Sequence, residues 1–550
     1  MTWNDGKSGA TGAVGRGMVS RRQFMVGASA LGIAAATFDM PAAFAATSTG
    51  GEFRWGLPEE PDTLDAQATP RAVSFQVLNY LGDSLLYRDM AGNRVPGLAK
   101  SWAVSPDGKV IEFTLRDDVK FQDGTPFDAT ALVFTFERGL DPATKSPIFP
   151  ALVGPVDKVE AVSPTLFRVT LKEPYGPLLD NFAARGTSWL QPLSKAAVDK
   201  SGAQYGRNPV STGPWKFASW DAGQEIVLDR NPDYAWGPEF LTNHGPMHID
   251  KMRLRIVPED GSRVAALQAG ELDYAPIPAT AYKRFAESPD FTVIRQLRKG
   301  TGLVIHFNFK EPPLDDLRVR QAMHLALDRE AIIAVAVEGQ GIAAYGPLPP
   351  SLPYYWPGVE QIGYHYDVAK ANALLDEAGW TMDADGIREK GGKKLAFDIL
   401  TLPSSDIQRA AQVIQQQFKA VGIALTLDTR PIGAINPLLF SHNFQLSFMF
   451  WIDHDPDILY REFHTNQIDG GVNWGSYSNP ELDKLLEEGR TTADAAARAA
   501  AYQKIQEIFV KEALWLPIYH VYELSALSNR VKGAVMHPDG YLILNDATIG

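Results

Sequence analysis

Hydrophobic positions along this chain repeat with two different periods, which predicts a mixture of strands and helices. Residues 110–115 and 167–171 alternate between apolar and polar side chains, and the turn Pro106-Asp107-Gly108 before the first run predicts a hairpin. A short strand is predicted at 52–56, and a helical run at 73–86 follows it. Strand and helix patterns that alternate along a chain indicate an α/β fold.

The clearest local prediction is a strand–helix–strand unit. Residues 395–400 and 423–427 form apolar strand patterns, Ser404 or Ser405 caps a helix between them, and Gly422 ends that helix. Two strands joined through a helix are expected to run parallel with a right-handed crossover. The apolar face of the helix consists of Ile407, Ala410, Ala411, Ile414, Phe418 and Val421.

Aspartates mark the starts of three further helices. Asp315 and Asp328 each precede a run with helical spacing of apolar residues, and Gly339 stops the second run. Asp367 precedes a third run, and Gly379 lies just past its end. The second part of the chain is therefore expected to be rich in helices.

The amino-terminal residues have the pattern of an export signal. Arg21 and Arg22 precede a weakly apolar run at 26–38 and the small-residue sequence Ala43-Phe44-Ala45. This order is typical of a secretory signal, and the arginine pair indicates the twin-arginine route. We expect residues 1–46 to be removed near Ala45 or Ala46. The alternative is a chance arginine pair before a short core helix.

Composition narrows the compartment and the function. The chain has no cysteine, which excludes disulfides, thiolate metal sites and a lipid-modified cysteine behind the signal. No stretch outside the signal is long and apolar enough to span a bilayer. We expect a periplasmic protein that is not lipid-anchored. The formal net charge of −13 disfavours nucleic-acid binding, which depends on clustered Lys and Arg.

Motifs for catalysis or for a bound metal are weak or missing. There is no G-x-S-x-G, P-loop, G-x-G-x-x-G before a helix, or H-E-x-x-H. His244 and His248 have helical metal spacing, but Gly245-Pro246 between them would break a helix. We expect no cofactor and no metal. The remaining candidates for a chelated-metal or haem site are scattered histidines: His306, His442, His454 and His464.

Ligands of open α/β sheets bind beyond the carboxyl ends of parallel strands, and two loops occupy such positions. In the first loop, Ser404 and Ser405 open a helix whose free N–H groups attract an anion such as a carboxylate. The second loop, 452–457, follows a third predicted strand at 445–451 and contains Asp453 and Asp455, which suit an ammonium or a hydroxyl. An Asp-rich loop is, however, more often a capped turn than a ligand site.

Flat aromatic faces add to this predicted site. Trp451 and Trp474 offer surfaces for apolar side chains or sugar rings, although a given Trp more often belongs to the core. Carboxylates at 453–457 would also permit acid–base chemistry, so a periplasmic hydrolase is the competing hypothesis.

Four sequence blocks together resemble the family 5 extracellular solute-binding proteins of ABC transporters, which include dipeptide, oligopeptide and nickel-chelate receptors. The resemblance covers about 53–544, nearly the whole chain after the signal. The blocks lie within Val95–Gly124, Asn208–Trp215, Leu314–Arg329 and Tyr366–Trp380. In the second block Ser211 stands where the family usually has Gly.

The resemblance implies a two-lobed periplasmic-binding-protein-like fold (type II, cluster C) with an extra mixed α/β domain in the first lobe. The expected parts are lobe I at 47–95, 206–309 and 520–550, the inserted domain at 96–205, and lobe II at 310–519. Strands at 303–308 and 513–520 are the expected crossings between the lobes. The resemblance also implies a monomer without catalysis that traps a solute between closing lobes and then docks on a membrane permease.

The resemblance leaves the ligand open. Peptide-binding relatives use an aspartate shortly after a Trp for the peptide amino group, which would be Asp453 or Asp455 here. Dipeptide binders place an arginine near the 401–406 loop, and Arg409 lies one turn into the following helix. Glu60, in the 57–65 loop, would face these groups from the first lobe. Small peptides, opines, modified peptides, metal chelates and short oligosaccharides all remain candidates.

Overall fold

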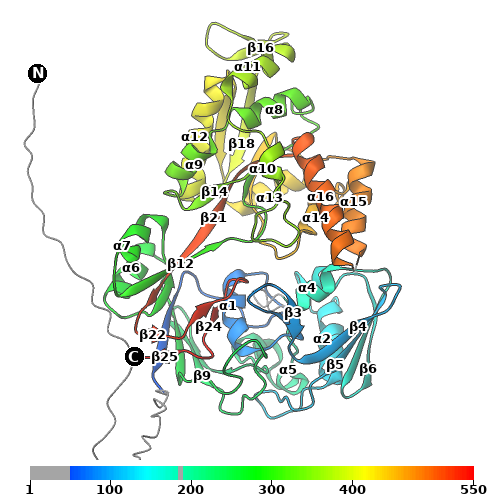
Figure 1. Ribbon diagram of the computed structural model, residues 1–550, viewed down its shortest axis with the longest axis vertical. Helices are drawn as coiled ribbons and strands as arrows, with labels where there is room; N and C mark the ends of the chain where they lie inside the picture. Colours follow the sequence, from blue (N-terminus) through cyan, green and yellow to red (C-terminus); the bar gives the residue numbers. More distant parts are fainter. Residues whose placement is uncertain (1–49, 184–189, 493) are drawn as a thin grey trace, which may run out of the picture. The chain divides into compact units, whose positions relative to one another are not determined.

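One long strand, β21 (Trp515–Ser528), joins two sheets of the protein (Figure 1). The computed structural model describes residues 50–183, 190–492 and 494–550, which excludes the predicted signal segment. β21 pairs antiparallel first with β13 (Leu303–Phe307) and further along with β12 (Phe291–Leu297). We call the strands on the β12 side the β1 sheet and those on the β13 side the β18 sheet. The chain therefore passes between the sheets at 298–302 and again within β21.

The β1 sheet has parallel pairing at its centre and antiparallel pairing at its edges. β1 (Glu52–Leu57) lies parallel to both β10 and β11, with Trp55 opposite Leu254 and Tyr274. β9 and β8 continue the sheet as antiparallel neighbours. The bounds on this side are α1 (Ala72–Leu81), β8 (Trp215–Asp221), β9 (Glu225–Arg230), β10 (Lys251–Ile256), α6 (Asp260–Gln268), β11 (Tyr274–Pro276) and α7 (Tyr282–Ala286).

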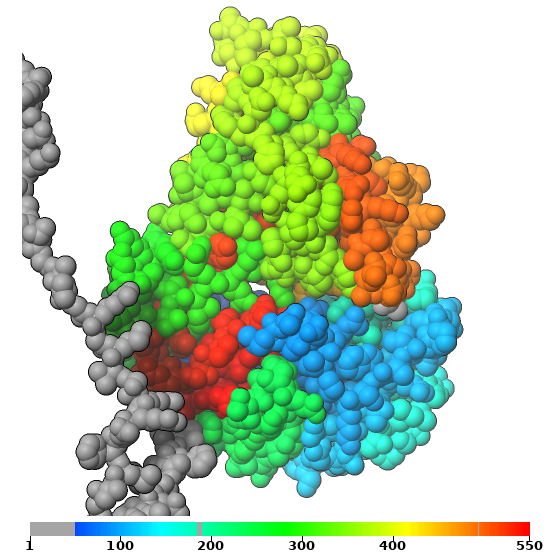
Figure 2. Space-filling view, in the orientation of Figure 1, coloured from blue at the N-terminus to red at the C-terminus, as the bar shows by residue number. Residues whose placement is uncertain are grey.

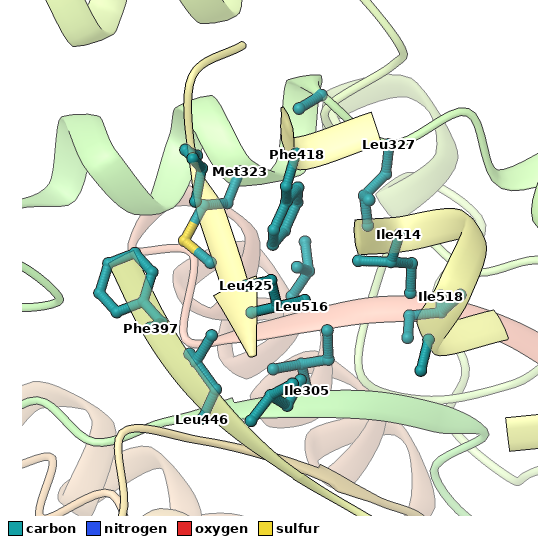
Figure 3. Close-up of a cluster of buried hydrophobic side chains, with 14 of the residues drawn as sticks. Ile305, Met323, Leu327, Phe397, Ile414, Phe418, Leu425, Leu446, Leu516 and Ile518 are labelled. Carbon is teal, nitrogen blue, oxygen red and sulfur yellow. The ribbon is translucent and has the colours of Figure 1, made fainter. Parts of the chain in front are cut away.

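The β18 sheet contains the predicted strand–helix–strand unit. β18 (Ala396–Thr401) is parallel to β19 (Ala424–Thr429) and to β20 (Leu446–Met449), and α12 (Ser405–Ala420) connects the first two. The helix buries its apolar face against side chains such as Ile305 and Leu446 (Figure 3). The residues of that face, all at most 3% exposed, are Ile407, Ala410, Ala411, Ile414 and Phe418. Removing this apolar area from water stabilises the layer.

Helices cover both faces of the β18 sheet, and β13 shows the alternation. Ile305 belongs to the α12 core, whereas Val304 packs with α14, α15 and α16 on the other face. Apart from α12, the helices of the chain between β13 and β21 are α8 (Leu317–Leu325), α9 (Arg329–Ala336), α10 (Val359–Ile362), α11 (Val368–Glu377), α13 (Ile432–Phe440), α14 (Ile458–Phe463), α15 (Pro480–Thr491) and α16 (Ala495–Lys511).

A separate antiparallel sheet, in the order β4-β5-β7-β6, has a hydrophobic core of its own with three helices. Its first hairpin turns at Gly108, whose φ of 70° lies in the left-handed region that glycine adopts without strain. The bounds are β4 (Ala99–Val104), β5 (Val110–Leu115), α2 (Ala129–Leu140), α3 (Phe149–Val153), β6 (Val156–Ser163), β7 (Leu166–Leu171) and α4 (Pro177–Ala183).

Short elements complete the described chain. Among them, β14 (Gly341–Ala343) pairs with β21 in the β18 sheet. The others are β2 (Leu86–Arg88), β3 (Arg94–Pro96), α5 (Lys195–Ser201), β15 (Thr381–Met382), β16 (Arg388–Lys390), β17 (Lys393–Lys394), β22 (Val531–Lys532), β23 (Val535–Met536), β24 (Leu542–Ile543) and β25 (Thr548–Ile549). Within the described residues, no helix combines the length and apolar character that crossing a membrane requires.

The structure corrects three local predictions. The helix predicted at 73–86 ends at Leu81, because Gly82 is extended and the apolar residues that follow join the core of the antiparallel sheet. The α8 helix is capped by Asp316, which accepts from the Arg318 N–H, and not by Asp315. Strand β13, at the predicted crossing of 303–308, pairs only with strands of the β18 sheet and β21, so the passage lies just before it.

Candidate functional site

A cavity of about 620 Å³ lies where β21 passes from one sheet to the other. Residues Val521–Ser525 of β21 line it, together with residues from both sheets and from the C-terminal segment. Figure 2 shows a hollow on this face between the red C-terminal residues and the green residues above them. A volume of this size suits one small organic molecule. The cavity is therefore the strongest ligand-site candidate in the described part of the chain.

The β18 sheet contributes the start of α12 to the cavity wall. Ser404, Ser405 and Asp406 line it, and the Ser404 hydroxyl donates a hydrogen bond to the Asp406 carboxylate. The helix begins here because β18 ends at Thr401 and Ser404 has the extended backbone of an N-cap residue. The negative Asp406 in the first turn also complements the positive end of the helix dipole.

Arg409 lines the same wall, but its guanidinium serves a neighbouring helix. It donates to the Ala336 carbonyl oxygen at 2.6 Å and to the Val335 carbonyl oxygen at 3.1 Å. These carbonyls belong to the last turn of α9, where intrahelical donors run out and a cation is favoured. Arg409 therefore ties α12 to α9 through its Nε and Nη2 atoms.

The β1 sheet contributes an aromatic and amide wall. Trp55 is 5% exposed and meets Tyr274 edge-on, with the ring centroids 5.4 Å apart. Burial raises the pKa of the Tyr274 hydroxyl to about 12, so this group stays neutral and can donate. Gln340, which follows α9 and is 8% exposed, also lines the cavity. Three lining residues each hold a polar atom that is closed to solvent and has no hydrogen-bond partner: Trp55 Nε1, Gln76 Oε1 and Gln340 Oε1.

The passage before β13 is fixed against the loop that contains Trp451. The Thr301 N–H donates to the Trp451 carbonyl at 3.1 Å, and the Trp451 N–H donates to Thr301 Oγ1 at 3.0 Å. A Cβ at Gly300 would lie 1.7 Å from the Trp451 carbonyl oxygen, so only glycine permits this approach. Arg298, at the start of the passage, lines the cavity and pairs with Glu523 at 2.9 Å.

The aspartates of the 452–457 loop lie outside the cavity lining, and each is paired with an arginine. Asp453 pairs with Arg461. Asp455 contacts Arg498 at 2.7 Å, and Asp457 contacts Arg490 at 2.8 Å. Burial opposes the charge of Arg498, yet the nearby Asp455 carboxylate raises its pKa well above its usual value.

Arg498 also connects this loop to the antiparallel sheet's helices. Its guanidinium lies 3.3 Å from Asp180 of α4, and Asp180 in turn contacts Arg88 at 3.1 Å. The side chains of Asp455 and Arg498 are only 4% and 2% exposed. The loop is therefore part of a buried ion network that joins distant parts of the chain.

The other predicted site residues also lie away from the cavity lining. Trp474 is buried and stacks on Trp451, with ring centroids 5.7 Å apart. Glu60 accepts hydrogen bonds from Trp220 Nε1 at 2.9 Å and from the Gly223 N–H at 3.1 Å. Of the predicted residues, the cavity brings together Ser404, Ser405 and Arg409, and the ligand-binding role of all eight stays a prediction.

Three histidines are held neutral by their surroundings. Burial lowers the pKa of His306, His454 and His520 to about 3. His442 contacts the Trp474 carbonyl at 2.8 Å, and His464 lies 3.2 Å from Glu487. Among residues 50–183, 190–492 and 494–550 there is no group of three His, Cys, Asp or Glu side chains placed to hold a metal ion.

The cavity contains residues that the sequence patterns did not single out. The sequence pattern places Trp55 in a strand, but Trp55 and Gln340, which lie far apart in the chain, line the same cavity. The C-terminal residues Gly540 and Tyr541 also line the cavity. A strand pattern shows which residues alternate, not which of them faces a distant loop, so no local signal could have identified this set.

Comparison with known proteins agrees with this architecture. The family described as bacterial extracellular solute-binding proteins, family 5 Middle, matches residues 93–469. The oligopeptide-binding protein AppA of Bacillus subtilis is 28% identical over 499 residues, 89% of this chain and 90% of AppA. Protein XP55 of Streptomyces lividans is 30% identical over 498 residues, 88% of this chain and 86% of XP55.

Solved structures show the same likeness. NikA from Brucella suis, in complex with Fe(III)-EDTA, superposes with a TM-score of 0.79 at 26% identity. That match covers 91% of this chain and all of the NikA chain.

Proposed function

Because this chain belongs to the bacterial extracellular solute-binding proteins of family 5, which are receptors of ABC transporters, we propose that it captures a small polar organic solute in the 620 Å³ cavity. The observation that carries the proposal is the cavity's position. Its lining comes from strands of the β1 sheet, from α9 and α12 beside the β18 sheet, and from the shared strand β21. Small rotations about 298–302 and β21 would open and close it around the solute.

The same proposal covers location and partners. Residues 1–46 direct export by the twin-arginine route, and the exported chain acts in the periplasm as a monomer without a lipid anchor. The closed form docks on the permease subunits of an ABC importer in the inner membrane. A peptide-like solute, as in AppA, and a chelate, as in NikA, are the precedents that the relatives supply.

The receptor binds its solute without changing it chemically. The competing hydrolase hypothesis needs an ionisable carboxylate free to exchange a proton with the substrate. The three aspartates of the 452–457 loop instead bind Arg461, Arg498 and Arg490. This pairing supports binding over catalysis.

A cavity-filling variant tests the proposal. Ser405 is exposed, opens α12 and lines the cavity, so Ser405→Trp fills the space without entering a core. Ser441, exposed after α13, provides the matched control Ser441→Trp. Dialysed protein is mixed with a small-molecule extract of bacterial cells, and thermal unfolding is followed by tryptophan fluorescence.

The wild type and Ser441→Trp should gain stability from the extract, and Ser405→Trp should not. The solute that binds should be recovered from the protein with the same mass that it has in the extract. An equal shift in all three proteins, or a solute recovered as a cleaved product, contradicts the proposal.

A further inference from the structure

The β1 side and the β18 side of the chain also meet away from the strand β21 that they share. The antiparallel sheet and α4 belong to the β1 side, because Phe182 of α4 shares a core with Tyr234, which lies between β9 and β10. Helix α16 belongs to the β18 side, because its Ile505 packs with Val304 of β13. Figure 1 shows α4 below α15 and α16. A rotation of one side against the other therefore changes the distance between α4 and α16.

The contact between α4 and α16 is close and shut off from water. The Asp180 carboxylate lies 3.3 Å from the Arg498 guanidinium, and the two side chains are 9% and 2% exposed. The Gly176 N–H donates to the Arg490 carbonyl oxygen at 2.7 Å. A Cβ at Gly176 would lie 2.9 Å from the Thr492 carbonyl oxygen, so only glycine permits this approach. We call the contact of Gly176 and Asp180 with Arg490, Thr492 and Arg498 the latch.

Each half of the latch has a second partner on its own side. Arg498 also binds Asp455 at 2.7 Å, and this pair stays intact whether or not the sides separate. Asp180 also binds Arg88 at 3.1 Å and Arg94 at 3.3 Å. A buried charge that loses its only partner is strongly destabilising, but separation of the sides would leave neither Arg498 nor Asp180 without a partner. The latch can therefore open without unfolding either side.

The cavity as described exists with the latch made. Helices α9 and α12 on one side, and Trp55 and Tyr274 on the other, contribute to its lining, whereas none of the latch residues lines it. A solute that contacts both sides binds the latched form best, so its apparent affinity depends on the fraction of protein that is latched. Resting on the proposed receptor role, we infer that the latch sets the affinity for the solute without contacting it.

Gly176→Ala tests this inference by placing a methyl group between the two sides. The nearest atoms to the new Cβ are the Thr492 and Arg490 carbonyl oxygens of the other side, at 2.9 and 3.1 Å. The φ angle of Gly176 lies outside the left-handed region, so alanine brings no backbone strain there. Gly433 of α13 has open space at the same position, and Gly433→Ala is the matched control.

Two spin labels report whether the latch is made. The chain has no cysteine, so Glu173→Cys, just after β7, and Lys504→Cys, on α16, place one label on each side at exposed positions. Electron paramagnetic resonance measures the distance between the labels in dialysed protein and at rising amounts of a small-molecule extract of bacterial cells. The extract should favour the short distance in the wild type.

Gly176→Ala should shift the labels toward a longer distance in dialysed protein and should need about tenfold more extract for half of the response. Gly433→Ala should match the wild type in both measurements. The urea midpoints of the two dialysed variants should agree, because separation of the sides relieves the clash at Gly176.

The other outcomes separate the two proposals. If Gly176→Ala has the label distance and the extract response of Gly433→Ala, the inference is overturned whatever its urea midpoint, and a response of the wild type to the extract leaves the receptor role intact. If the extract changes neither the label distance nor the melting temperature of any of the three proteins, the receptor role is contradicted and the inference fails with it.

Discussion

Replacing Asp455 should destabilise the fold and leave solute affinity unchanged. Asp455→Ala removes the carboxylate that lies 2.7 Å from the Arg498 guanidinium, in a pair whose side chains are 4% and 2% exposed. Asp180 would remain as the acidic partner of Arg498 at 3.3 Å, but it also serves Arg88 and Arg94. One carboxylate would then face three guanidinium groups.

Leaving a buried charge without its partner typically costs about 3–5 kcal/mol of unfolding free energy. We expect a loss in that range for Asp455→Ala. Asp455→Asn should lose less, because the amide oxygen still accepts from Arg498. Replacing both partners, as Asp455→Ala with Arg498→Met, should recover part of the loss, since no unpaired charge remains.

Urea unfolding followed by tryptophan fluorescence measures these differences as shifts in midpoint at constant slope. Asp469 is exposed in the same region, and Asp469→Ala should stay within about 0.5 kcal/mol of the wild type. If Asp455→Ala is as stable as Asp469→Ala but has lost its solute, then Asp455 belongs to the binding site and the charge reasoning is wrong.

Three further predictions concern stability. Ile414→Ala, in the fully buried face of α12, should lower the unfolding free energy by about 2–5 kcal/mol in urea melts, and the exposed Lys419→Ala should change it little. Burial lowers the pKa of His520 to about 3, so below pH 6.5 the unfolded chain binds more protons than the folded chain, and the unfolding free energy falls as the pH falls. His520→Gln should reduce the slope of unfolding free energy against pH by about 1.4 kcal/mol per pH unit between pH 4 and 6. Lys299→Met leaves the buried Asp539 carboxylate without its main cationic partner and should cost about 3–5 kcal/mol by calorimetry, whereas a cost below about 1 kcal/mol would show that Arg88 suffices.

Local chemistry explains why much of the β18 sheet could be predicted from the sequence. The α12 face repeats every three or four residues, and Asp328 and Asp367 cap α9 and α11 as expected. The parallel pairing of β18 with β19 follows from the helix between them. These features need only neighbours within about one helix or strand, which a linear sequence displays directly.

The cavity could not be predicted in the same way. Whether Asp455 faces a ligand or an arginine depends on Arg498, 43 positions away and on another helix. Arg409 has the charge expected of a carboxylate-binding residue, but the carbonyl end of α9 lies within its reach. The sequence shows which groups are available, and tertiary contacts decide which of them the chain uses for itself.

The proposed capture of a solute in the cavity is best tested by a crystal structure of the protein with that solute bound. We expect a chemically unaltered solute inside the cavity, with Arg498 still bound to Asp455. A solute seated on Asp453 or Asp455 with the arginines displaced, or one bound outside the cavity, would contradict it.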